Sequence, residues 1–457
     1  METHHHKRSA FSGKLGFVLS AAGASVGLGN IWRFPYLAAK YGGGIFLLIY
    51  IILAFTFGYT MIVAETALGR MTKKSPVGAF SAFGKGPGLS FGGWINAIIP
   101  ILIVPYYSVI GGWVIKYLVE YLRGGGSALA QDGYFSGFIS NGVSVELCFL
   151  AFTLFTLAII FAGVRNGVER VSKCMMPVLA VLSVIIAVYS VTRPGALAGV
   201  KYFLVPNLDN FSWMTVVSAM GQMFYSLSIA MGILITFGSY MKKDVSIESS
   251  TANVEIFDTA IAIMAGLMII PAVFAFSGGD PDTLQAGPAL MFITIPKVLD
   301  SMGMGTVVGV LFFVLVLFAA VTSSIALTES AVSTFEDELG WKRHKSTLLI
   351  GVIMVALGSL SALGYGPLGE VTVFGMQFLD LFDFLTNSVM MPIAAIAICL
   401  LVSRVIGVEK IEEEVTQEGG RFRRKAIFNF MIRYLCPLFA AIILVSSVAN
   451  ALGWIKM

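Results

Sequence analysis

The chain has 457 residues, of which 57% are hydrophobic and only 12% are charged, and its mean hydropathy is +0.86. A water-soluble domain of this length does not tolerate so apolar a composition, so a soluble enzyme or binding module is excluded. The formal net charge of +4 is too small to indicate nucleic acid as a partner. The composition therefore predicts an all-α protein with many membrane spans.

Apolar stretches of about 20 residues predict eleven membrane-spanning helices. Most of the 30 Lys and Arg residues fall at the amino terminus and in alternate loops between these helices. By the positive-inside rule, the amino terminus is predicted to be cytoplasmic and the carboxyl terminus external. The expected helices are 14–37, 42–70, 89–122, 143–163, 168–192, 213–240, 252–277, 304–337, 346–363, 374–402 and 425–452.

The four cysteines lie inside apolar segments and lack the spacing of a zinc site. We therefore expect packing residues, without a disulfide framework. They are Cys148, Cys174, Cys399 and Cys436.

The first predicted helix carries an interruption in its middle. Between Lys14 and Arg33 lie 18 uncharged residues, which include Gly23, Gly27 and Gly29. Each glycine costs a helix about 1 kcal/mol relative to alanine, so a broken helix is predicted. Unpaired backbone at membrane depth is tolerated only inside protein or beside a cavity. Its carbonyls can hold a cation and its amides an anion, which suits sodium beside a carboxylate.

The sixth predicted helix has a second interruption, in the sequence GQMFYSLSIAMG at 221–232. Ser226, Ser228 and Gly232 break an otherwise aliphatic and aromatic run. Two broken helices five spans apart predict an inverted repeat, with helices 1–5 and 6–10 as its two halves.

The string GASVGLGNIWRFPY, the glycines at 42–44, Glu65 and the Gly69–Arg70 pair follow one another in order. They resemble the first two helices of the neurotransmitter:sodium symporter family. The resemblance implies the LeuT fold, a 5+5 inverted repeat in which helices 1 and 6 are broken. Most members have twelve spans, so this chain is expected to lack the last. The implied organisation is a cytoplasmic segment 1–13, repeat 1 at 14–192, repeat 2 at 193–402 with an external hairpin at 278–300, a cytoplasmic loop at 403–424, and helix 11 with an external carboxyl terminus at 425–457.

Sodium is a hard cation that prefers oxygen ligands, and the eighth span offers adjacent hydroxyls at Thr322, Ser323 and Ser324. Taken alone, such hydroxyls in a membrane helix usually bond a preceding carbonyl or pack at a helix contact. The resemblance instead implies two sodium sites. The first consists of Ser25, Asn30, Ser226 and Asp258. The second consists of Gly23, Val26, Ala319, Thr322 and Ser323.

Asp258 is an acidic residue within the seventh span, where an ionisable side chain indicates a functional site. The alternative is a position near the cytoplasmic interface. In chloride-requiring relatives the corresponding position is neutral and a bound chloride supplies the negative charge. In some chloride-independent relatives the acid lies one turn later, where this chain has Ala262. The resemblance therefore predicts transport that needs no chloride.

The resemblance also implies a substrate pocket. The Tyr107 hydroxyl and the amides near Leu28 and Gly29 would bind a carboxylate, and carbonyls near Ser226 and Ser228 would bind an ammonium group. The walls would be apolar and aromatic, which favours an apolar or aromatic L-amino acid, although another small amino acid or amine stays possible. The complete predicted set is Ala24, Ser25, Leu28, Gly29, Ile103, Tyr107, Tyr225, Ser226, Ser228, Met231, Ser323 and Leu327.

Charged residues near the two membrane faces resemble the gates of the family. Arg33 and Asp383 match the external pair, and Arg8 and Asp337, with Tyr240 and Ser239 nearby, match the internal pair. An exposed ion pair contributes about 0–1 kcal/mol, which suits a gate that must open.

Three further residues have both a functional and a structural interpretation. Glu65 is expected to accept hydrogen bonds from loose amides of the two breaks, or to be purely structural. Gly167 and Pro177 match the family motif for local unwinding of the fifth span, although a proline in a membrane helix needs no such role.

Two other classes of function fit less well. An ion channel should show a repeat typical of a selectivity filter or a ring of charges, and the sequence has neither. An intramembrane enzyme lacks residues, because all four histidines, at 4–6 and 344, lie outside the predicted spans. We predict a sodium-coupled symporter of a bacterial inner membrane whose partners are substrate, two sodium ions and lipid. The amino acid, the ion stoichiometry and the oligomeric state stay open.

Overall fold

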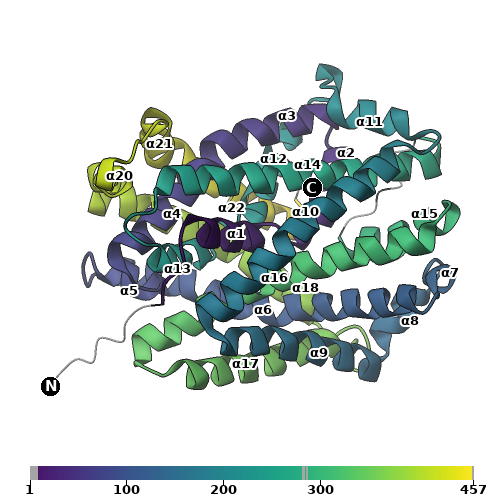
Figure 1. The fold of residues 1–457 in the computed structure, drawn as a ribbon, viewed down its shortest axis with the longest axis horizontal. Helices are drawn as coiled ribbons and strands as arrows, with labels where there is room; N and C mark the ends of the chain where they lie inside the picture. Colours follow the sequence, from purple (N-terminus) through teal and green to yellow (C-terminus); the bar gives the residue numbers. More distant parts are fainter. Residues whose placement is uncertain (1–8, 280–283, 285–286, 455–457) are drawn as a thin grey trace.

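The computed structural model describes residues 9–279, 284 and 287–454 (Figure 1). Within these residues, nine helices are long and apolar enough to cross a membrane. They are Gly44–Thr72, Pro87–Leu122, Gly142–Phe161, Val164–Val191, Ile247–Ser277, Gly305–Leu339, Arg343–Leu363, Phe378–Ile406 and Lys425–Ala451.

The first and sixth predicted spans are each split into two helices. Lys14–Ser25 and Gly29–Lys40 are bent by 55° at their break, and together they are apolar and long enough for one further span. The sixth span is present as α12 (Trp213–Ser226) and α13 (Ile233–Tyr240). The structure therefore confirms a helical membrane protein and shows both predicted interruptions.

The structure divides the first half of the chain into the following helices. They are α1 (Lys14–Ser25), η1 (Gly29–Arg33), α2 (Phe34–Lys40), α3 (Gly44–Leu53), η2 (Ala54–Gly58), α4 (Tyr59–Thr72), α5 (Pro76–Ser81), α6 (Pro87–Leu122), α7 (Gly126–Leu129), α8 (Tyr134–Ser140), α9 (Gly142–Phe161), η3 (Val164–Glu169), α10 (Arg170–Val191), α11 (Ala196–Leu204) and η4 (Leu208–Asn210).

After α12 and α13, the second half of the chain continues with a further series of helices. It comprises α14 (Ile247–Ser277), η6 (Leu290–Thr294), α15 (Ile295–Ser301), α16 (Gly305–Leu339), α17 (Arg343–Leu363), α18 (Phe378–Asp383), η7 (Phe384–Met390), α19 (Met391–Leu400), η8 (Leu401–Ile406), α20 (Val408–Thr416), η9 (Gln417–Gly419), α21 (Lys425–Phe430), η10 (Met431–Leu435) and α22 (Cys436–Ala451).

The long helices run between two ends of one bundle, which we name the α20 end and the α15 end (Figure 1). Helices α5, α20 and α21 gather at the first end, and α7, α8, α11 and α15 lie at the second. In the middle of the bundle α1 packs against α14 and α16, α4 runs along α13, and α6 lies against α16. The two breaks thus face each other at the centre.

The outer surface of the bundle is apolar. On α10, Val181, Val184 and Val188 are more than half exposed. In water such a surface would be unfavourable, whereas lipid tails are as apolar as these side chains. The pattern fits a bundle that is surrounded by lipid.

Several short helices were not predicted, and α20 lies within the segment 403–424 that was assigned to a loop. A search for 20-residue apolar stretches cannot find a nine-residue amphipathic helix. Residues 280–283 and 285–286 of the expected hairpin 278–300 lie outside the described part. The rest of the hairpin includes η6 and α15, which follow each other directly and form one helix. Lys297 of this helix pairs with Asp132 and holds the pKa of the Asp132 carboxyl below its usual range.

Candidate substrate and sodium site

The first break holds its backbone with two amide side chains. Helix α1 ends at Ser25, and Val26 has extended backbone with φ −71° and ψ 94°. Beyond it, the Gly27 amide donates to Asn30 Oδ1 at 3.2 Å, and Gln222 Nε2 donates to the Gly29 carbonyl at 3.1 Å. The Asn30 side chain thus gives the Gly27 amide a partner, and Gln222 adds a hydrogen bond to a carbonyl that also accepts from the Phe34 amide.

The glycines of this break have two effects: they weaken the helix, and they leave room for close contacts with neighbouring helices. A Cβ added at Gly29 would lie 2.2 Å from a ring carbon of Tyr225. One added at Gly27 would lie 2.8 Å from Ser323 Oγ. Glycine therefore lets α12 and α16 approach the backbone of the first break directly.

The second break contains left-handed residues that are not glycine. Ser228 has φ 52° and Ala230 has φ 58°, and each such residue costs about 1–3 kcal/mol. Two hydrogen bonds support them: Ser228 Oγ donates to the Ala24 carbonyl at 3.0 Å, and the Ala230 amide donates to Glu65 Oε1 at 2.7 Å. Glu65 thus accepts a loose amide of the second break, which is one of the two breaks named in the prediction.

A small cavity of 30 Å³ lies between the two breaks. Its lining includes every residue of the predicted substrate set except Ser226, and adds Gly27 and Asn30. Tyr107 OH accepts a hydrogen bond from the Leu28 amide at 3.3 Å and keeps its own proton for another acceptor. The cavity is lined by Ala24, Ser25, Gly27, Leu28, Gly29, Asn30, Ile103, Tyr107, Tyr225, Ser228, Met231, Ser323 and Leu327.

Next to the cavity, Asp258 lies at the centre of a buried polar cluster. Asn30 Nδ2 donates to Asp258 Oδ1 at 2.8 Å, and Ser226 Oγ donates to Oδ2 at 2.9 Å. Ser226 Oγ in turn accepts from Asn30 Nδ2 at 2.9 Å and from Tyr50 OH at 3.0 Å. Three of the four residues predicted for the first sodium site are therefore in direct contact, with a fully buried carboxylate among them.

The fourth residue of that set, Ser25, lines the same cavity, and its hydroxyl donates to the Ala21 carbonyl at 3.1 Å. Sequence reasoning missed Tyr50 and Gln222. Tyr50 carries the only polar side-chain group of α3, GIFLLIYIIL, and this isolation within an apolar run is the signal that could have found it.

A second group of oxygens lies where α16 crosses the first break. Ser323 Oγ is 3.2 Å from the Gly23 carbonyl oxygen and 3.3 Å from that of Val26. Thr322 Oγ1 lies 3.2 Å from the Ala319 carbonyl oxygen. A Cβ added at Gly23 would lie 3.1 Å from that of Thr322, so the two helices are in contact here. The structure brings together all five residues predicted for the second sodium site.

A larger cavity of 410 Å³ leads from Tyr225 toward the α15 end, and both Arg33 and Asp383 line it. The Arg33 guanidinium lies over the Tyr225 ring, 5.2 Å from its centroid. Asp383 accepts from Asn387 Nδ2 at 2.6 Å and from Tyr106 OH at 3.3 Å. Between these two described residues there is no ion pair within 4.0 Å, so the predicted external gate is not engaged.

At the α20 end, the predicted internal gate is only partly described, because Arg8 lies outside the described residues. Asp337 Oδ2 accepts from the Ser75 amide at 2.6 Å. Tyr240 OH donates to Glu329 Oε1 at 2.8 Å, and Arg343 forms an ion pair with the same carboxylate. Sequence reasoning missed Glu329, although it is an acidic residue within an apolar span.

The segment before α1 is fastened to the start of the fifth span. The Ser12 amide donates to Glu169 Oε2 at 2.9 Å, and Lys173 forms an ion pair with Glu169 at 2.6 Å. Gly167 lies in the π-helical turn η3, where an added Cβ would lie 2.0 Å from the Ile159 carbonyl oxygen. This part of the fifth span departs from regular α-helix, whereas Pro177 lies within α10, so local unwinding between the two residues stays a prediction.

Comparison with known proteins gives the family. The model of the sodium:neurotransmitter symporter family matches residues 8–125 and 136–454. The chain belongs to the sodium:neurotransmitter symporter family. It is 35% identical to the uncharacterized sodium-dependent transporter YhdH of Bacillus subtilis, covering 95% of this chain and 96% of the relative. It is 27% identical to the sodium- and chloride-dependent GABA transporter 2 of Macaca fascicularis, over 94% of this chain and 77% of that protein.

Among solved structures, the symporter resembles MhsT in complex with L-phenylalanine. The TM-score is 0.86 at 34% identity, covering 96% of this chain and 100% of MhsT. The protein is therefore a sodium-dependent membrane transporter with the LeuT fold, and it is not an enzyme.

Proposed function

We propose that this symporter imports an apolar or aromatic L-amino acid together with sodium by alternating access. The observation that carries the proposal is the cavity between the two breaks, where the Tyr107 hydroxyl and the backbone of the broken helices meet apolar side chains. L-phenylalanine in complex with MhsT supports this substrate class.

The polar groups suit the two charged ends of a free amino acid. The substrate carboxylate would accept from Tyr107 OH and from amides at Leu28 and Gly29, where the outer half of the broken helix begins. The ammonium would donate to carbonyls of the second break near Tyr225 and Ser228. A substrate without one of these groups would leave buried polar partners unsatisfied, which costs about 1–3 kcal/mol.

The side chain of the substrate would lie among Ile103, Met231 and Leu327. The cavity volume of 30 Å³ holds about one water molecule, so the pocket must widen around its ligand. Met231 is suited to this change, because an unbranched thioether repacks around groups of different shape. An apolar ligand of variable size therefore fits better than a charged one.

Two sodium ions are proposed, because both predicted ligand sets assemble. One would lie at Asn30, Ser226 and Asp258, with the substrate carboxylate completing its shell, and the other between the first break and Thr322 and Ser323. Carbonyl, hydroxyl and carboxylate oxygens are the ligands that a hard cation prefers.

Asp258 would also make chloride unnecessary. Two sodium ions and a zwitterion bring net positive charge into a poorly solvated centre, where uncompensated charge is costly. The buried carboxylate of Asp258 supplies a compensating negative charge. On the empty return step, protonation of Asp258 would neutralise it and export a proton.

The α20 end is proposed to face the cytoplasm of a bacterial inner membrane, with the carboxyl terminus outside, because the basic residues gather in the loops of that end. In this orientation the 410 Å³ cavity opens to the exterior. The described conformation is then outward-facing at Arg33 and Asp383, and closed toward the cytoplasm.

A binding screen of the twenty amino acids in sodium and in potassium buffer tests the proposal. We expect binding of leucine, methionine, phenylalanine or tryptophan in sodium only. Preference for glutamate, lysine or an amine without a carboxylate would contradict the substrate class. Uptake into vesicles that persists without a sodium gradient would contradict coupling itself.

A further inference from the structure

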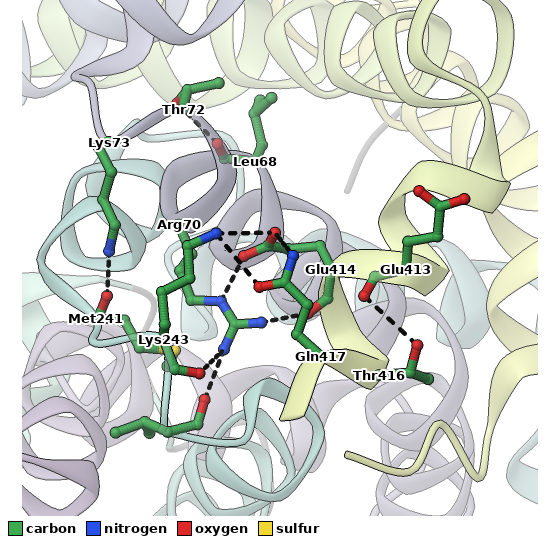
Figure 2. A network of polar contacts seen from close by, with 11 residues as sticks. Leu68, Arg70, Thr72, Lys73, Met241, Lys243, Glu413, Glu414, Thr416 and Gln417 are labelled. Carbon is green, nitrogen blue, oxygen red and sulfur yellow. Dashed lines mark hydrogen bonds and ion pairs between the residues drawn. The ribbon is translucent and has the colours of Figure 1, made fainter. Parts of the chain in front are cut away.

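Arg70 is a fully buried arginine that sequence reasoning used only as a family marker. It lies in the last turn of α4 with a side-chain exposure of 1%, and its nitrogens contact two other segments of the chain (Figure 2). Nε donates to Glu414 Oε1 of α20 at 2.6 Å, and another nitrogen donates to the Glu414 carbonyl. Nη1 donates to the Val245 carbonyl, in the connection between α13 and α14, at 2.6 Å.

The Glu414 carboxylate is shared with two groups at the protein surface. Lys243 Nζ lies 3.5 Å from Oε2, and Gln417 Nε2 donates to the same oxygen at 2.9 Å. Lys243 is 48% exposed and Gln417 is exposed, whereas Glu414 is 3% exposed. The ion pair therefore lies one side chain away from water, which lowers the cost of separating it compared with a pair deep in the core.

On one side of this ion pair, α4 and α13 pack as a single unit. A Cβ added at Gly69 would lie 1.9 Å from the Ile235 carbonyl oxygen, and one at Gly238 would lie 2.4 Å from that of Thr66. Backbone in contact at two positions cannot slide without breaking the packing. Glu65, on the same α4, holds the Ala230 amide of the second break at 2.7 Å. A movement of α4 at Arg70 is thus carried to the substrate cavity.

On the other side, α20 is attached to the last two spans. It follows η8 after the single residue Gly407, which has φ 86°. Glu412 pairs with Lys425 of α21 at 2.5 Å, and Glu409 pairs with Arg433 of η10 at 3.3 Å. Helix α19 packs against α6 and α22. The Arg70 and Glu414 pair therefore joins the α4 and α13 unit to a different group of helices.

We propose that Glu414 is a positioning residue for transport: it fastens the α4 and α13 unit at the cytoplasmic end, and its contact with Arg70 must be released when that end opens. This inference rests on the proposed alternating-access function. Loss of the contact should raise the population of inward-open molecules, while the outer helices stay folded.

Hydrogen–deuterium exchange of the purified full-length transporter in sodium buffer tests this role. Glu414→Gln removes the charge and keeps the shape, and Glu413→Gln is the matched control, because the Glu413 carboxylate is exposed and points away from the cluster in Figure 2. We expect the backbone amides of α13 to exchange at least about threefold faster in Glu414→Gln than in the wild type. In Glu413→Gln they should exchange at the wild-type rate. Glu414→Asp, which keeps the charge, should lie between them.

Equal α13 exchange in the two glutamine variants would overturn the inference. Faster exchange spread evenly over α6 and α9 would overturn it as well, since that is the result of a merely structural role. If Glu414→Gln does not fold, Gln417→Ala removes an exposed partner of the carboxylate, and α13 exchange must still rise. If sodium leaves exchange in wild-type α13 unchanged while Glu414→Gln still accelerates it, sodium-coupled alternating access fails, and only the fastening of α13 through Arg70 and Glu414 is retained.

Discussion

At the scale of single residues, two adjacent tyrosines of α6 serve different cavities. Tyr107 OH reaches the first break at the Leu28 amide, whereas Tyr106 OH reaches Asp383 in the larger cavity. Consecutive residues of a helix point about 100° apart, so one helix can line both the proposed substrate cavity and the larger cavity.

Tyr107→Phe is predicted to weaken amino-acid binding about tenfold to hundredfold, because a hydrogen bond to a charged group contributes about 1.5–3 kcal/mol. Tyr106→Phe is the matched control and should change affinity far less. Both are measured by isothermal titration in sodium. Equal losses in the two variants would show that the carboxylate is not bound at Tyr107.

Asp258→Asn is predicted to lose uptake in chloride-free gluconate medium, because the neutral amide leaves the sodium charge uncompensated. Chloride should restore part of this uptake if the anion can enter beside Tyr50 and Ser226. Wild-type uptake is expected to be the same in both media. A wild-type protein that needs chloride would show that Asp258 does not provide the compensating charge.

At the scale of helices, α16 brings adjacent hydroxyls to different neighbours. Ser323 Oγ lies beside the Gly23 and Val26 carbonyls, and Ser324 Oγ lies 3.2 Å from Thr156 Oγ1 of α9. One serine thus faces the broken helix and the next faces the packed scaffold.

The double variant Thr322→Ala, Ser323→Ala is therefore predicted to raise the sodium concentration that half-saturates substrate binding by about tenfold or more, since two ligands of one ion are removed. Ser324→Ala should leave this concentration unchanged. It should lower the free energy of unfolding by about 1 kcal/mol, which is the contribution of one hydrogen bond. A sodium response that is unaltered in the double variant would place the second sodium site elsewhere.

Helix α4 links the substrate cavity to the α20 end. Glu65 and Arg70 lie five positions apart on it, and one contacts the second break while the other contacts α20. A rigid helix of 14 residues can carry a small displacement between these points, because packed helices shift as units.

At the scale of the whole molecule, the two cavities and the ion pairs of the α20 end define one conformation. The described residues Arg33 and Asp383 line the 410 Å³ cavity without forming an ion pair, whereas Ser12 and Lys173 bond Glu169 and fasten the segment before α1 to the start of the fifth span. The proposed alternating access would require these contacts to separate while the 410 Å³ cavity closes.

The orientation predicts the labelling of two exposed positions. In a variant without its four cysteines, Gln131→Cys at the α15 end should react with a membrane-impermeant maleimide on intact cells. Glu413→Cys on α20 should react only after the membrane is opened. The reverse pattern would show that the charge asymmetry was misread.

The sequence by itself determined the order of the apolar helices, the two breaks and the motif residues, because these depend on local runs of apolar residues, glycines and hydroxyls. It also indicated Asp258, since an acid within an apolar span is costly unless it has a role. Tertiary structure decided that Tyr50 bonds Ser226 beside Asp258 and that Gln222 bonds the Gly29 carbonyl. It also showed that the glycines of the first break serve close helix contacts. The Arg70 and Glu414 pair joins residues 344 positions apart, and no local pattern specifies which distant partner fills a buried space.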